Sequence, residues 1–134
     1  MNPDTWNVLH DGRVVAARRD GDCIILIVRI EYLCGELPTA GDTLTLTLHG
    51  CDRFRWAGYD EPPTDDPARM PDRAEIIGAV AQGDGLGVDG CYGELAVRYT
   101  SATVATAEGQ MLAQAELEAA AGRYWRKWAE RNNP

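Results

Sequence analysis

One segment alternates strictly between threonine and leucine, and it constrains the fold more than any other part of the chain. It reads Thr43-Leu44-Thr45-Leu46-Thr47-Leu48. Successive side chains of a β-strand point to opposite faces of the sheet, so this segment has one apolar face and one polar face. Such a strand covers a core with its apolar face and meets solvent with the other. The segment therefore predicts an antiparallel sheet with one packed side.

Two Asp-Gly pairs precede this segment and indicate tight turns. They are Asp11-Gly12 and Asp20-Gly21, and they separate residues 5–10, 13–19 and 22–33. Asp-Gly tolerates the positive φ angles of hairpin turns, so each pair predicts a β-hairpin. The third segment is rich in β-branched residues, and we expect one long strand there, apolar on both faces at its start. After an interruption at Gly50 the pattern continues to Trp56, which predicts a β meander over about residues 5–56.

Residues 59–73 predict a long solvated loop, because proline cannot donate to a strand ladder. The prolines and acids of this loop are Asp60, Glu61, Pro62, Pro63, Asp65, Asp66, Pro67, Pro71 and Asp72. Further strands are expected over 74–80, 94–100 and 102–106. Residues 85–90 match the pattern G-x-G-x-x-G, but a strand pattern follows where a dinucleotide-binding fold needs a helix. We interpret these residues as a glycine-rich hairpin loop.

The C-terminal residues predict a helix over about 113–131. Leu117, Ala121, Tyr124 and Trp128 recur at spacings of four, three and four, which places them on one helix face. We expect this apolar stripe to pack on the sheet, and we expect Trp125, beside the stripe, to be exposed. The predicted fold is a single α+β domain over 1–134, with a mainly antiparallel curled sheet or sandwich-like half-barrel and one C-terminal helix.

The net charge of −8 limits the partners of the chain. An acidic surface repels phosphate backbones and anionic membranes, so we expect neither a nucleic acid nor a membrane as partner, whereas a basic protein is compatible. The first residues lack the basic and apolar pattern of a signal peptide, and we expect a cytoplasmic protein. In that reducing compartment Cys23, Cys34, Cys51 and Cys91 are expected to be free thiols.

No catalytic or metal-binding constellation stands out in the sequence. The close pair His49-Gly50-Cys51 lacks the second pair that a structural zinc site needs. Asp84 and Asp89 form a single copy of a calcium-binding repeat that works in stacked arrays. Cys51 with His10 or His49 and a carboxylate is a conceivable nucleophilic triad, but two histidines and four cysteines allow such a trio in any chain. We assign no catalytic residue, no cofactor and no metal ligand.

A partner surface is the remaining candidate site. Tryptophan is enriched at interface hot spots, and clustered carboxylates suit a basic partner. The candidate residues are Trp125, Asp60, Glu61, Asp65 and Asp66.

Four segments carry a resemblance to known proteins. They are Trp6-Asn7-Val8-Leu9-His10-Asp11-Gly12, Ile30-Glu31-Tyr32-Leu33, Leu48-His49-Gly50-Cys51 and Gly93-Glu94-Leu95-Ala96-Val97-Arg98-Tyr99. In these segments the chain resembles small bacterial proteins, some of which are similar to immunity proteins that neutralise secreted toxins. The resemblance implies a binding protein and assigns no functional residue.

The leading hypothesis is a non-enzymatic intracellular binding protein, immunity-like, whose acidic surface meets a basic protein partner. The first alternative is a small-molecule-binding or hydrolytic domain with a pocket between sheet and helix. A second alternative is a subunit of a homo-oligomer. A closed pocket containing His10 or His49 would favour the first alternative, whereas an acidic patch with exposed aromatic residues would favour the leading hypothesis.

Overall fold

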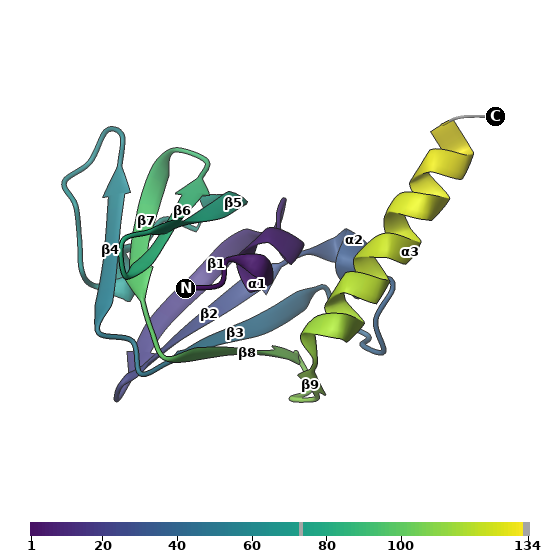
Figure 1. The fold of residues 1–134 in the computed structure, drawn as a ribbon, viewed down its shortest axis with the longest axis horizontal. Helices are drawn as coiled ribbons and strands as arrows, with labels where there is room; N and C mark the ends of the chain where they lie inside the picture. The colour runs from purple at the N-terminus through teal and green to yellow at the C-terminus, as the bar shows by residue number, and fades with distance from the viewer. Residues whose placement is uncertain (73, 133–134) are drawn as a thin grey trace.

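The computed structural model describes residues 1–72 and 74–132, and it shows an open antiparallel sheet with one long C-terminal helix (Figure 1). The helices are α1 (Asp4–Val8), α2 (Glu31–Cys34) and α3 (Gln114–Asn132), with a 3-10 turn η1 (Pro67–Arg69). The strands are β1 (Arg13–Asp20), β2 (Cys23–Arg29), β3 (Thr43–His49), β4 (Arg53–Gly58), β5 (Ala74–Gln82), β6 (Gly85–Gly90), β7 (Gly93–Arg98), β8 (Ser101–Thr106) and β9 (Met111–Leu112). The predicted α+β class, mostly antiparallel sheet with a C-terminal helix, is confirmed.

The sheet consists of two halves that are joined by a short ladder. The strand order is β4-β7-β6-β5-β1-β2-β3-β8-β9, and every neighbouring pair is antiparallel. Among the described residues, β5 and β1 pair at two positions, Arg13 with Glu75 and Val14 with Ala74. The halves β4-β7-β6-β5 and β1-β2-β3-β8-β9 therefore diverge beyond this junction, as Figure 1 shows. This divergence curls the sheet without closing it.

The strand 43–48 packs as its alternation predicts. Leu44, Leu46 and Leu48 are all 0% exposed, whereas the threonines between them are half-buried on the other face. The cross-strand partners of Leu46 are Leu26 and Val104, which are also buried. One face of β2, β3 and β8 thus forms a continuous apolar layer.

Residues 5–10 do not form the expected first strand, and α1 occupies most of this segment. The helix buries Trp6, and Leu9 follows three residues later as a second buried side chain. Trp6 Nε1 donates a hydrogen bond to Tyr99 Oη over 2.9 Å, which satisfies the polar atom of the buried indole. The strand expectation was wrong because the spacing of these two apolar residues is helical.

The two Asp-Gly pairs make different turns. The Asp20-Gly21 hairpin is confirmed, since Asp20 pairs with Cys23 and Gly21 has a φ of 61°. Asp11-Gly12 instead leads from α1 into β1, with Asp11 at a φ of 69°. A Cβ on Gly12 would lie 2.7 Å from Val28 Cγ1, so glycine allows the chain to pass close to β2 at this point.

The third segment is also shorter as a strand than expected. Strand β2 ends at Arg29, and the chain turns into α2, whereas we expected one strand to residue 33. Ile30 and Leu33 are both buried, at a spacing of three that fits a helical turn. Tyr32 Oη donates a hydrogen bond to the His10 carbonyl oxygen over 2.8 Å, which ties this turn to α1.

The glycine-rich segment is a strand, so its interpretation as a hairpin loop was wrong. Strand β6 pairs with β5 on one side and with β7 on the other. Its glycines stand where neighbours leave no room for a side chain: a Cβ on Gly85 would lie 2.5 Å from the Val97 carbonyl oxygen. A Cβ on Gly90 would lie 3.3 Å from the Trp56 ring. Close packing, and not turn formation, explains these glycines.

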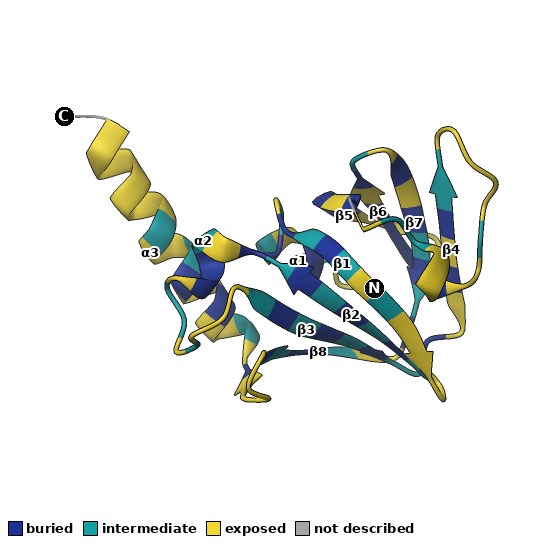
Figure 2. Ribbon diagram, turned by 180° about the vertical axis from the view of Figure 1, so that it is seen from behind, coloured by how far each residue is buried: buried dark blue, intermediate teal, exposed yellow. Residues whose placement is uncertain are grey.

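Helix α3 is buried against the body along its first half only, and its second half makes surface contacts with it. Leu117 and Ala120 are buried, whereas nearly all residues from Gly122 onward are exposed on a helix that projects from the sheet (Figure 2). Trp128 is 45% exposed, so the expectation that it packs on the sheet was wrong. The sheet ends before it reaches the second half of the helix. In the second half of the helix, Lys127 Nζ forms an ion pair with Glu36 Oε1 over 2.9 Å.

Candidate functional site

Trp125 lies in an aromatic cluster at the base of the projecting part of α3. Its side chain is 39% exposed and stacks on His10, with ring centroids 5.9 Å apart and an interplanar angle of 11°. Tyr32, Tyr124 and Trp128 lie around it. A shallow hollow of about 300 Å³ adjoins Trp125 and His10 between α1 and α3.

Three of the four predicted acids of the 59–73 loop make local contacts. Glu61 accepts a hydrogen bond from Trp56 Nε1 over 3.1 Å, and Asp65 lies 3.7 Å from Arg55. Asp66 accepts a hydrogen bond from the Ala68 backbone N–H over 3.0 Å, which caps η1. These contacts order the loop. The fourth acid, Asp60, is exposed.

The structure does not bring Trp125 and these acids into one surface. The loop follows β4 at one end of the molecule, whereas α3 lies at the other end (Figure 1). A partner that contacts both would have to span the length of the sheet. The two predicted components of the partner surface are therefore separate features.

The structure brings Cys23 close to His49, whereas the sequence suggested Cys51 as the partner of a histidine. Cys23 Sγ lies 3.6 Å from His49 Nδ1, and His49 Nε2 lies 2.8 Å from Thr103 Oγ1. Cys51 points elsewhere and donates to the Arg53 carbonyl oxygen over 3.3 Å. Desolvation, and then the neighbouring Asp22 carboxylate, raise the pKa of the Cys23 thiol. A raised pKa opposes the thiolate that nucleophilic catalysis needs.

The two acids of the calcium-binding pattern, Asp84 and Asp89, also lie apart from each other. Asp84 is held by Arg98 and Arg53, whose hydrogen bonds lower the pKa of its carboxyl. Asp89 lies apart from Asp84, on β6. Within residues 1–72 and 74–132 no three His, Cys, Asp or Glu side chains gather closely enough to hold a metal ion. All four cysteines are free.

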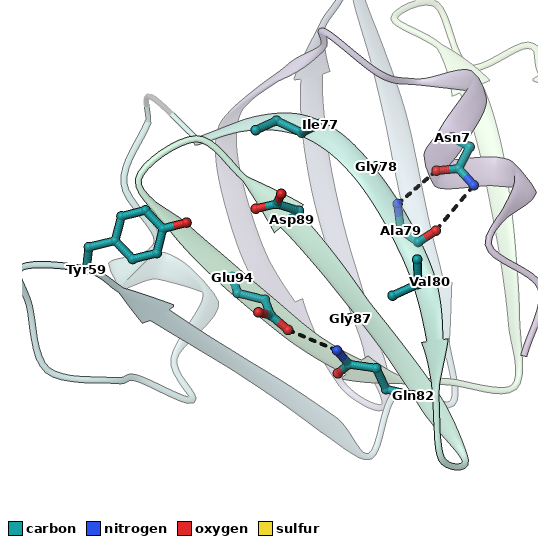
Figure 3. A pocket seen from close by; sticks show the side chains of 10 residues that line it. All are labelled: Asn7, Tyr59, Ile77, Gly78, Ala79, Val80, Gln82, Gly87, Asp89 and Glu94. Carbon is teal, nitrogen blue, oxygen red and sulfur yellow. Dashed lines mark hydrogen bonds between the residues drawn. The ribbon is translucent and has the colours of Figure 1, made fainter.

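A further hollow lies on β5, β6 and β7, on the face turned away from the core (Figure 3). Its volume is about 530 Å³. Three large apolar side chains border it: Ile77, Val80 and Tyr59 are 57%, 61% and 73% exposed. Two carboxylates, Asp89 and Glu94, occupy directly opposite positions on β6 and β7. Of these five residues the sequence singled out Asp89 alone, and for a calcium-binding pattern, because their grouping requires 85–90 to be a strand.

Glycines and an amide shape the floor and one edge of this hollow. Gly78 and Gly87 present no side chain on its floor. At the edge, Asn7 of α1 accepts a hydrogen bond from the Ala79 N–H over 2.8 Å and donates one to the Ala79 carbonyl oxygen over 3.3 Å. Asn7 thus substitutes for a neighbouring strand along β5, as the dashed lines in Figure 3 show. The floor of the hollow is thus built on hydrogen-bonded strands, and Tyr59 of the loop after β4 borders it.

Comparisons with protein-family models, curated proteins and solved structures found no match for this chain. None of the helices that the structure describes is both long and apolar enough to cross a membrane.

Proposed function

We propose that this chain is a non-enzymatic binding protein that meets a polypeptide partner at the hollow on β5, β6 and β7. The observation that carries this proposal is the combination of exposed apolar side chains with two opposed carboxylates on a rigid sheet face. Monomeric proteins rarely expose several large apolar residues side by side, and such a group on the surface marks an interaction site. Sites built on strands also hold their side chains more accurately than sites on loops.

The partner that suits this surface is basic. The chain carries a net charge of −8, and the carboxylates of Asp89 and Glu94 lie inside the hollow. Complementary charge accelerates encounter and selects against acidic partners. An immunity-like role in the cytoplasm, in which the chain covers a functional surface of a basic toxin, is the form of binding that we propose. The free thiols support a reducing compartment.

Self-association is the second candidate, and the aromatic cluster on α3 favours it. Trp125 and Trp128 expose large rings on a helix that projects from the body. Tryptophan anchors many interfaces between identical subunits. Sedimentation of the wild-type chain and of the Trp125→Ala variant measures this function. A wild-type chain that stays monomeric at high concentration would exclude it.

Capture of the partner from the native cell tests the proposed function. The tagged chain should retain a partner that the Val80→Arg variant loses, because arginine at this position fills the hollow and repels a basic partner. Met111→Arg is the matched control, since Met111 is 58% exposed on a distant strand. Thermal melts check that both variants fold. Retention of the same partner by Val80→Arg would contradict the proposal.

A further inference from the structure

We infer that the hollow on β5, β6 and β7 receives an arginine side chain of the partner. This inference rests on the proposed function and specifies what enters the site. It depends on three features of the hollow: a pair of carboxylates with no basic residue in the lining, apolar walls beside them, and an open floor at Gly78.

The carboxylates of Asp89 and Glu94 are placed where a sheet normally avoids like charges. Asp89 and Glu94 occupy directly opposite positions of β6 and β7, an arrangement of like charges that destabilises a strand pair, and the Glu94 carboxylate turns away from Asp89 towards Gln82 (Figure 3). Glu94 accepts a hydrogen bond from Gln82 Nε2 over 3.2 Å, and none of the described residues that line the hollow is basic. A cation from outside the chain would relieve this repulsion.

The arginines on the same sheet face are already paired with other acids. Arg55 lies 3.7 Å from Asp65. Arg53 and Arg98 both contact Asp84 at the end of the β5–β6 hairpin, and Arg98 also donates two hydrogen bonds to Asp52. The arginines of this sheet face therefore contact acids outside the hollow, whereas the carboxylates of Asp89 and Glu94 lie inside it.

The walls fit the stem of a long basic side chain. Ile77 and Val80 stand on one side as exposed apolar surface, along which three methylene groups can lie. Figure 3 shows the Tyr59 ring on the opposite side, with its hydroxyl directed towards the side where Asp89 and Glu94 lie. An aromatic ring next to a bound guanidinium adds cation–π attraction. The apolar and anionic parts of the hollow are therefore arranged as an arginine needs them.

The opposed carboxylates favour a guanidinium over an ammonium. Directly opposite residues of an antiparallel pair have Cβ atoms about 4.5–5.5 Å apart, so one planar group can reach both carboxylates when the Glu94 side chain turns from Gln82 towards Asp89. A guanidinium offers five donors in a fixed plane and is weakly hydrated, whereas an ammonium is a compact and strongly hydrated charge. The hollow should therefore bind arginine more tightly than lysine.

The two glycines of the floor act differently: Gly78 leaves its part of the floor open, whereas Gly87 makes room for the Gln82 side chain. Gly87 lies opposite Val80 in the β5–β6 ladder, and a Cβ at Gly87 would collide with the Gln82 side chain. Gly78 lies opposite Asp89, and its Cβ would lie 3.5 Å from Asn7 Oδ1. A side chain at Gly78 would occupy space beside Asp89 that the guest needs, and over Gly87 that space is already taken by the Gln82 amide, which donates to Glu94.

A nuclear magnetic resonance titration of the full-length chain tests this inference. The probes are the blocked tripeptide Gly-Arg-Gly and two matched peptides in which lysine or citrulline replaces arginine. Citrulline has the shape of arginine without its charge. The arginine peptide should shift the amide signals of Gly78, Gly87 and Asp89 to saturation. Its affinity should exceed that of the lysine peptide about fivefold and that of the citrulline peptide at least tenfold.

Two charge-removing variants locate the effect. Asp89→Asn and Glu94→Gln keep the shape of each side chain, and each should weaken binding of the arginine peptide at least fivefold. Glu130→Gln, an exposed change of the same kind on α3, should leave it unaltered. Equal binding of the citrulline peptide, equal binding of the lysine peptide, or unchanged affinity in both hollow variants would overturn the inference.

The partner capture separates this inference from the proposed function. If Val80→Arg loses the captured partner while Asp89→Asn and Glu94→Gln keep it, the hollow is the interface but its guest is not arginine. If Val80→Arg keeps the partner, the proposed function itself fails. Loss of the partner in all three variants, with retention in Glu130→Gln, supports both.

Discussion

At the scale of single residues, the two faces of β3 contribute differently to the stability of the fold. Leu46 is buried between Leu26 and Val104, whereas Thr45 lies on the opposite face between Ile27 and Ala105. Removal of a buried leucine side chain loses transfer free energy and leaves a cavity. Truncation of a half-buried threonine leaves no cavity in the core. The cost of a substitution on this strand should therefore alternate along the chain.

Leu46→Ala should lower the free energy of unfolding by about 2–5 kcal/mol, and Thr45→Ala by less than about 1 kcal/mol. Urea denaturation of the two variants measures both values. Two small and equal losses would show that the leucine face is not the core face.

The charge pair in the hollow has a measurable consequence for stability as well as for binding. Asp89→Asn removes one of two directly opposed charges and should raise the free energy of unfolding by about 0.2–1 kcal/mol. The gain should shrink at high salt, because salt already screens the repulsion between exposed carboxylates. A variant less stable than the wild type at low salt would mean that Asp89 has a stabilising contact in the free protein.

At the scale of secondary-structure elements, α3 divides into a packed half and a projecting half. Leu117 is buried against the body, while Trp128 lies beyond the sheet, 45% exposed, with its ring edge-on to that of Trp125. The periodic apolar stripe is real, but the sheet is too short to cover all of it. Its outer residues are therefore available for contacts with another chain.

Leu117→Ala should cost about 2–5 kcal/mol of stability, and Trp128→Ala less than about 1 kcal/mol. Thermal and urea unfolding of the two variants provide the comparison. A loss at Trp128 as large as that at Leu117 would mean that the outer half of the helix packs on the body in solution.

The sequence predicted elements wherever one strong local pattern decides the structure. The strict alternation at 43–48, the Asp20-Gly21 turn and the alanine-rich helix each depend on local periodicity or turn chemistry. Residues 5–10 and 85–90 were predicted wrongly, since a helix of five residues and a glycine-containing strand exist only through their tertiary contacts. The hollow could not be predicted at all, because it needs the register of β6 against both neighbours.

At the scale of the whole molecule, the free energy of unfolding should decrease at high pH, because the folded protein buries groups that lose a proton there. Burial raises the pKa of Tyr32 to about 12 and that of Cys34 to about 11, and nearby acids add to both effects. In an unfolded chain these groups ionise near pH 10 and pH 9. The folded protein therefore keeps protons that the unfolded chain releases, and its stability should fall as pH rises between about 9 and 12.

Tyr32→Phe should flatten this decline between pH 10 and 12, because phenylalanine has no proton to release in either state. The variant should also be less stable at neutral pH, since it lacks the hydrogen bond from Tyr32 Oη to the His10 carbonyl oxygen. Tyr59→Phe is the matched control, because it changes an exposed tyrosine and should leave the decline intact. Urea midpoints at pH 8, 10 and 11 supply the measurement. Parallel declines in the wild type and Tyr32→Phe would show that the alkaline loss of stability comes from other groups, Cys34 first among them.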